Sequence, residues 1–293
     1  MRLAFPLAMH REPSLKDASP VALWTRRTKM AVLSARRLVA WQTRTEHFPA
    51  PLIASRPLAH VLYSTRIPLH RADAHPVFEA GKKHNLALAA PSFDGLLVEP
   101  GRPFSFWRTL GRVTEARGFR HGMELAGGCI VPAIGGGLCL LARALFQAAV
   151  FTGQRIIERH GHSMQAVEPP PGVPWGIDAT VLWPYVDLRF APVDRLVRLG
   201  VSIRDEALLV TVTGSAPLTE RFEVEAVDER VTQEADGRIR HNRIVRHAIG
   251  ASGERRSETL AINRTRMLTP EKQQRSCLTC GETTCHARVE VPA

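Results

Sequence analysis

Three consecutive glycines that lead into a cysteine and a long apolar helix constrain this chain more than any other stretch. Residues 138–151 have helical periodicity, and Cys139 is their second residue. Glycine permits positive φ and close approach of other groups. A helix N-terminus offers unpaired N–H groups and about half a positive charge, which favours a thiolate over a thiol. We therefore expect a tight turn that places Cys139 in the first helical turn. The turn consists of Gly135, Gly136, Gly137 and Leu138.

The positive charge of the chain is concentrated near its beginning. Of the formal net charge of +11, residues 1–75 hold +8, from twelve Lys and Arg against four acidic residues. Apolar positions recur at helical spacing from Leu23 to Trp41, with arginines on the other face. Such a basic amphipathic helix is compatible with an anionic membrane surface or nucleic acid as a partner. A solvated helical face is the structural alternative, and no nucleic-acid-binding motif is present.

The compartment is predicted from what the sequence does not contain. The first nine residues include a proline and are too short for a signal core, and no stretch reaches the roughly 18 apolar residues of a membrane span. Five cysteines, three of them near the C-terminus, do not form a typical disulfide framework. We expect a cytoplasmic protein, with peripheral membrane contact through the basic region as an option.

Hydrophobic periodicity predicts an α+β fold in four segments. These are a basic helical N-terminal region with a proline-rich connector (1–76), a central mixed α/β domain (77–215), a β-rich extension (216–270) and a Cys-rich tail (271–293). The connector, residues 48–76, is expected to have little regular structure. Helices are expected at 78–88 and 138–151, strands at 96–98, 155–163, 178–183, 186–190 and 222–231, a hairpin over 197–212 and an exposed hairpin around Asp236-Gly237.

Several spaced motifs resemble one known family. They are Pro100-Gly101-Arg102-Pro103-Phe104-Ser105-Phe106-Trp107, Gly135-Gly136-Gly137-Leu138-Cys139, Glu158-Arg159-His160-Gly161-His162-Ser163 and Asp178-Ala179-Thr180. Together, over roughly residues 85–215, they are similar to the VanW family. The resemblance implies a link to vancomycin resistance and the cell envelope by name, with no established biochemical activity. The family usually has glutamine after the cysteine, where this chain has Leu140.

The first chemical interpretation is a cysteine nucleophile. Cys139 would attack, His160 or His162 would act as its base, and Asp178 would orient that base. The chain order is similar to that of papain-like and NlpC-type cysteine hydrolases. The backbone N–H groups of residues 138–140 would be candidate oxyanion donors. Amide bonds of cell-envelope type substrates would suit such a hydrolase or transferase.

Two other interpretations of the same residues stay open. Cys139 could be a buried helix-start residue in a non-catalytic binding or scaffold protein, with structural glycines and histidines. Alternatively, Glu158, His160 and His162 share one face if 155–163 is a strand, and the two histidines could then ligate zinc with Asp178 or Cys139.

The C-terminal tail holds a second candidate metal centre. Cys277, Cys280, Cys285 and His286 fall within ten residues, as in a zinc knuckle. We expect structural zinc there, with an iron–sulfur cluster, a redox dithiol or a disordered tail as alternatives. Because Cys285 and His286 are adjacent, His241, His247 or a second chain could supply the fourth ligand.

Overall fold

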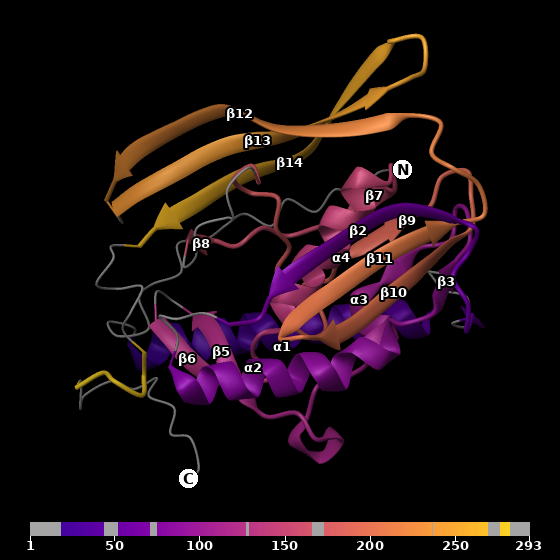
Figure 1. Ribbon diagram of the computed structural model, residues 1–293. Coiled ribbons are helices and arrows are strands. Elements are labelled where there is room, and N and C mark those ends of the chain that lie inside the picture. The colour runs from indigo at the N-terminus through magenta and orange to yellow at the C-terminus, as the bar shows by residue number, and fades with distance from the viewer. Residues whose placement is uncertain are drawn as a thin grey trace.

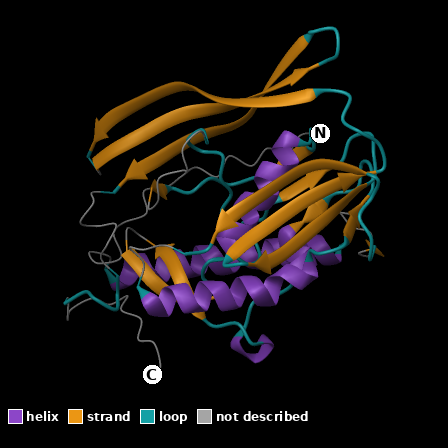
Figure 2. Ribbon diagram, in the orientation of Figure 1, coloured by secondary structure: helices purple, strands orange, loops and turns teal. Residues whose placement is uncertain are grey.

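The computed structural model describes residues 19–43, 52–70, 75–126, 129–165, 173–235, 237–268 and 276–281. Within these residues the fold is α+β with a β-rich C-terminal part, as predicted, and Figures 1 and 2 show helices on one side of a central sheet and a second long sheet beyond it. No helix in the described part of the chain is both long and apolar enough to cross a membrane.

The central sheet is antiparallel and has the strand order β1-β3-β10-β11-β2. Its strands are β1 (Leu52–Ile53), β3 (Leu96–Val98), β10 (Val197–Arg204), β11 (Ala207–Gly214) and β2 (His60–Pro68). Helix α4 (Leu138–Phe151) packs against β2 and β11, and α2 (Pro76–Ala89) packs against β10. The predicted hairpin over 197–212 and both predicted helices are therefore confirmed.

The C-terminal sheet is built from three long strands, which confirms the predicted meander. Strands β12 (Arg221–Glu234), β13 (Gly237–Ile249) and β14 (Arg255–Met267) are antiparallel, and the short β8 (Met164–Gln165) joins β14 in parallel. Pairing of Glu234 with Gly237 confirms the hairpin, although Asp236 lies outside the described residues. Strand β12 contacts α4, so this sheet reaches the helix that carries Cys139.

Short elements complete the central part of the chain. One small sheet has the order β4-β9-β7, and another pairs β5 with β6. Their bounds are β4 (Phe104–Ser105), β9 (Arg189–Ala191), β7 (Arg155–Glu158), β5 (His121–Ala126) and β6 (Cys129–Ile134). The short helices are α3 (Phe106–Leu110), η2 (Ala90–Ser92) and η3 (Glu115–Arg117). The aromatic core lies beside them: Phe93, Phe104, Phe106 and Phe190 are all 3% exposed or less.

The N-terminal helix α1 (Pro20–Gln42) forms as the periodicity predicts, with Ser19 as its N-cap and Pro20 in its first turn. None of its residues is fully buried. It contacts the rest of the chain near both ends: Leu23 packs with Val131 of β6, and the Trp41 and Trp183 rings meet edge-on with centroids 5.6 Å apart.

Two sequence predictions of secondary structure are wrong. The connector contains the nine-residue strand β2, because its prolines flank the strand or end it at Pro68 and leave the alternating pattern between them intact. The predicted strand 155–163 ends at Glu158, and the predicted strands 178–183 and 186–190 reduce to one bridge between Leu182 and Val186 and to β9. In these segments, hydrogen bonds made by side chains take the place of strand pairing, and they form the candidate site described below.

Candidate functional site

The triple-glycine turn is shaped by backbone contacts. A Cβ on Gly136 would lie 2.2 Å from the backbone carbon of Gly122 on β5, so no larger residue fits there. Gly135 and Gly137 have φ of +79° and +100°, which disfavours residues with a side chain. Asn85 of α2, fully buried, donates to the carbonyls of Gly136 and Arg120 at 3.0 and 2.9 Å. The glycines therefore have a structural role, which is to fix where α4 begins.

Cys139 occupies the first turn of α4, as predicted, and is partly buried. Its Sγ lies 3.5 Å from the hydroxyl of Thr180 and 3.9 Å from the carbonyl oxygen of Val181. Burial alone would raise the pKa of the Cys139 thiol. A hydrogen bond from His162 and the charge of His162, helped by Thr180 and Val181, outweigh burial and lower this pKa. The site thus favours a thiolate.

His162 is the histidine that bonds Asp178 and lowers the pKa of Cys139. Its Nδ1 bonds Oδ2 of Asp178, which also accepts the backbone N–H of His162 at 3.3 Å. Burial would lower the pKa of His162, but Asp178 and Cys139 raise it to about 10. Burial would likewise raise the pKa of Asp178, and His162 with Arg159 depresses it instead. An imidazolium held between a thiolate and a carboxylate results.

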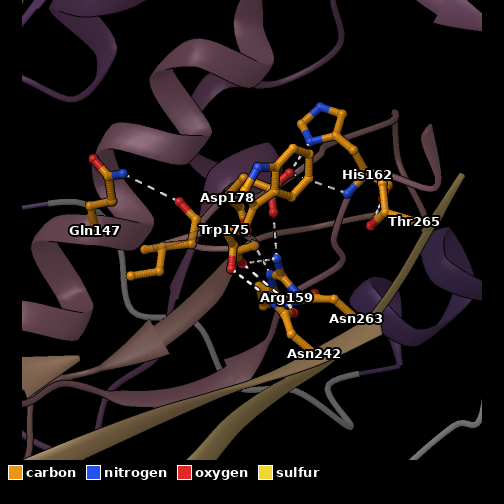
Figure 3. Close-up of polar contacts among 10 residues, drawn as sticks. Gln147, Arg159, His162, Trp175, Asp178, Asn242, Asn263 and Thr265 are labelled. Carbon is orange, nitrogen blue, oxygen red and sulfur yellow. Dashed lines mark hydrogen bonds and ion pairs between the residues drawn. The ribbon is translucent and has the colours of Figure 1, made fainter. Parts of the chain in front are cut away.

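Arg159 holds Asp178 in place, and Figure 3 shows the contacts. Its side chain is 4% exposed and donates at 2.6 Å to the Asp178 carboxylate, to the Asp178 carbonyl, to the Gly176 carbonyl and to Asn263 Oδ1. The guanidinium also lies over the Phe146 ring of α4, 5.4 Å from its centroid. Arg159 is therefore saturated with partners, and it fixes the carboxylate that orients His162.

The C-terminal sheet supports this network from outside. Asn263 of β14 donates to Asn242 of β13 at 2.9 Å, and Asn242 donates to the Trp175 carbonyl at 2.8 Å. Thr265 donates to the carbonyl of His162 at 3.2 Å. From the other side, Gln147 of α4 donates to the Ile177 carbonyl at 3.3 Å. The segments that carry Asp178 and His162 are thus tied to α4 and to the sheet (Figure 3).

His160 belongs to a different cluster. Its Nε2 lies 3.1 Å from Glu158, which also accepts Arg37 of α1 at 2.6 Å. Burial, above all, and the charge of Glu158 raise the pKa of the neighbouring Asp187 to about 7. Hydrogen bonds from Ser105 and Trp107 act in the opposite direction. The predicted shared face of Glu158, His160 and His162 is wrong, because the strand ends at Glu158 and the two histidines bond different carboxylates.

The predicted oxyanion donors are mostly engaged within the turn. The N–H of Leu138 donates to the Gly135 carbonyl at 3.3 Å, and that of Leu140 to the Gly137 carbonyl at 3.0 Å. Within the described residues the N–H of Cys139 has no such partner. Of these three amides, only that of Cys139 is therefore free of a backbone partner among the described residues.

The tail cysteines lie away from Cys139, beside β6. Cys277 donates its N–H to the Ile130 carbonyl at 2.9 Å, and its side chain packs with Cys129 and Val131. Cys280 is exposed, while Cys285 and His286 lie outside the described residues. No three potential ligands among His, Cys, Asp and Glu are grouped for a metal ion in the part of the chain that the structure describes. His241 and His247 bond Thr232 and Glu225 on the C-terminal sheet.

Sequence reasoning missed the residues that support the site. Arg159 stands in a matched motif directly before His160, which is the only signal that could have drawn attention to it. Thr180 likewise stands in a motif, but its contact with Cys139 depends on the fold. Asn263 lies a hundred residues downstream on an unremarked strand, and no spacing rule connects it to Arg159.

Comparisons with known proteins find matches in the region of the chain that contains these residues. The model of the family described as VanW like protein matches residues 81–213, close to the expected 85–215. The Vancomycin B-type resistance protein VanW of Enterococcus faecalis (strain ATCC 700802 / V583) is 30% identical over 164 residues, which are 55% of this chain and 60% of that protein. The Uncharacterized protein YoaR of Bacillus subtilis (strain 168) is 34% identical over 109 residues, 37% of this chain and 35% of that protein.

The matches thus cover less than two thirds of either relative, and no solved structure matches the chain significantly. The candidate residues Cys139, His162 and Asp178 all fall inside the family match, whereas Asn263 and Thr265 fall beyond it. Residues 81–213 are therefore a VanW-like region, similar to the two relatives over that part of the chain.

Proposed function

We propose that this protein is a cysteine-dependent hydrolase or transferase that acts on amide bonds. The observation that carries the proposal is the His162 imidazole, whose Nδ1 bonds the Asp178 carboxylate and which lowers the pKa of the Cys139 thiol. This is the arrangement in which a thiol becomes a nucleophile and its base keeps one orientation. Cell-envelope amides are the proposed substrates, on the strength of the resistance name carried by the Enterococcus faecalis relative.

The reaction follows from the positions of these groups. The Cys139 thiolate attacks the amide carbonyl carbon, and the oxyanion that forms accepts the N–H of Cys139. The C–N bond then breaks as His162 gives its proton to the leaving amine, which leaves a thioester on Cys139. Water, in a hydrolase, or a second amine, in a transferase, loses a proton to His162 and attacks the thioester, which restores the thiolate.

Alkylation by iodoacetamide at pH 6, read out by peptide mass spectrometry, tests this proposal. A lowered thiol pKa should make Cys139 react at least about tenfold faster than an unperturbed thiol, since each unit of pKa changes the thiolate fraction about tenfold. The exposed Cys280, in protein freed of metal with a chelator, is an internal reference in the same chain. His162→Gln should abolish the advantage, and His160→Gln should keep it because His160 bonds Glu158.

The competing role is a non-catalytic binding or scaffold protein. In that case Cys139 would react no faster than Cys280 at pH 6, and His162→Gln would change only stability. That pair of results would remove the basis for the enzyme proposal.

We also propose that the tail binds structural zinc through Cys277, Cys280 and Cys285. Thiolates in a Cys-x-x-Cys turn are typical zinc ligands, and Thr279 donates its N–H to the Ser276 carbonyl at 3.0 Å to close that turn. Cys129 packs beside Cys277, which makes it a better placed fourth ligand than His241 or His247.

Elemental analysis of the purified full chain tests the zinc proposal. About one zinc per chain is expected, lost in Cys277→Ser and in Cys129→Ser but kept in His286→Ala. Metal lost in His286→Ala and kept in Cys129→Ser would instead identify His286 as the fourth ligand, and a metal-free wild-type chain would exclude the site.

A further inference from the structure

Arg143 is a cation without a partner beside the candidate nucleophile. It lies four residues after Cys139 on α4, so the two side chains share one face of the helix. Its side chain is partly buried, and within the described residues it makes no hydrogen bond or ion pair. Arg159 of the same site, by contrast, is bonded to four acceptor atoms.

The surroundings of Arg143 show where its guanidinium lies. Burial lowers its pKa, while the charges of Asp178 and of Tyr63 on β2 act in the opposite direction. Arg143 therefore stands on the same side of α4 as the Asp178 carboxylate, without forming an ion pair with it. Both oxygens of that carboxylate are already taken, Oδ1 by Arg159 and Oδ2 by His162.

A partly desolvated guanidinium is unfavourable unless an anion binds it. Arginine presents five donors in a planar fork, which matches a carboxylate in a bidentate geometry. Surface arginines reach solvent freely and need no such partner. Arg143 instead is partly buried on the face of α4 that carries Cys139, which is where the group beside a scissile amide would lie.

We propose that Arg143 binds a carboxylate of the substrate, next to the amide that Cys139 attacks. The proposal rests on the proposed function and adds a substrate class to it: peptides or amino-acid amides with a free carboxylate close to the reacting carbonyl. Neutral amides of the same size would bind less well.

Two alkylating reagents of similar size isolate this interaction. Iodoacetate and iodoacetamide both alkylate Cys139, but only iodoacetate carries a carboxylate two bonds from the reacting carbon. The ratio of their rate constants reports binding of the anion, whereas the iodoacetamide rate alone reports the thiolate. Arg143→Gln should lower the ratio at least about fivefold and leave the iodoacetamide rate within about twofold, as expected for loss of a charge-assisted contact.

Two controls separate the local contact from the net charge and from misfolding. Arg204→Gln, on the exposed turn between β10 and β11, removes the same charge and should leave the ratio unchanged. On the unmodified chain, propionate should slow alkylation of Cys139 by iodoacetamide more than propionamide does at equal concentration.

The outcomes distinguish the two proposals. A ratio that stays unchanged in Arg143→Gln while iodoacetamide still reacts fast, or equal protection by propionate and propionamide, overturns the carboxylate site alone. A wild-type Cys139 that reacts with iodoacetamide no faster than Cys280 overturns the proposed function itself. Should Arg143→Gln fail to fold, the protection measurement on the wild-type chain decides.

Discussion

Asp178 is the central residue of the candidate site. Its Oδ1 accepts a hydrogen bond from Arg159, and its Oδ2 bonds both the backbone N–H and the imidazole of His162. Sequence order placed Cys139, His162 and Asp178 in one candidate group, because cysteine, histidine and acid stand in motifs with few titratable competitors, and His162 and Asp178 are in contact. It could not choose between His160 and His162, since that choice depends on where β7 ends.

The pH dependence of stability should report the His162–Asp178 pair. His162 has a folded-state pKa of about 10, above the 6.5 of an unfolded chain. The stabilisation is therefore fully present below about pH 6.5 and is lost as pH rises through about 10. Urea unfolding of wild type and His162→Gln should show the largest difference in unfolding free energy near pH 6 and a shrinking difference toward pH 10. A difference that grows with pH would contradict the charged pair.

Gly136 should tolerate no side chain. Its added Cβ would meet the backbone of Gly122 at 2.2 Å, and neither backbone has room to shift. Gly136→Ala is expected to cost about 3 kcal/mol or more of unfolding free energy, a large value for one methyl group. Gly200→Ala is the matched control, because the nearest atom to its Cβ is the flexible end of Arg198 at 3.4 Å. Equal stability of both variants would show that the turn is looser than described.

At the scale of elements, the site is assembled from parts that are far apart in the chain. Helix α4 supplies Cys139, the segments after β7 and before β9 supply the other two residues, and β13 and β14 support them. Helices and the hairpin were predictable because their periodic patterns are local. The pairing of β2 with β11 was not predictable, because the neighbouring prolines suggested a segment without regular structure and the partner strand lies about 150 residues away.

The C-terminal sheet should tune the reactivity of Cys139 through Asn263. Asn263→Ala removes the acceptor of Arg159 Nη1 and leaves a buried donor without a partner, a loss worth about 1–3 kcal/mol. We expect slower alkylation of Cys139 at pH 6 and a higher pH midpoint for that reaction. Thr259→Ala, on the exposed face of the same strand, should change neither. Loss of stability with an unchanged pH midpoint would mean that the sheet has only a structural role.

Helix α1 presents an apolar stripe to solvent, and we propose that it lies on an anionic membrane. Val21, Trp24, Val32 and Val39 are 71%, 68%, 53% and 55% exposed. The helix has five cations and no acidic residue between 20 and 42. Apolar exposure flanked by cations is the pattern of helices that lie at a lipid interface.

Vesicle flotation tests this proposal for α1. The chain should bind vesicles that contain phosphatidylserine and not neutral phosphatidylcholine vesicles, and Val32→Glu should weaken binding severalfold because a charge enters the apolar stripe. Val193→Glu, also at an exposed valine, should not. Equal binding of Val32→Glu, or tighter binding to duplex DNA than to vesicles, would reject a lipid partner.

On the scale of the whole molecule, the residues that match the family do not include all the strands that support the candidate site. Residues 81–213 contain Cys139, His162 and Asp178, but β2, β12, β13 and β14 all lie outside that range. Composition and motifs therefore predicted the class of fold and three members of the site. They could not predict which distant strands hold that site in shape, since such contacts have no local signature.

The short segment from Glu158 to His162 is bound at both ends, by α1 through Arg37 and by the candidate site through Asp178. It therefore provides a route for energetic coupling between the N-terminal helix and Cys139. Coupling between two binding events is reciprocal: if a surface that binds α1 changes the affinity of the site for a ligand, that ligand changes the affinity of α1 for the surface by the same factor. Arg37→Ala should break this link, so that vesicles no longer alter the alkylation rate of Cys139, and a vesicle effect that persists in Arg37→Ala would place the coupling elsewhere.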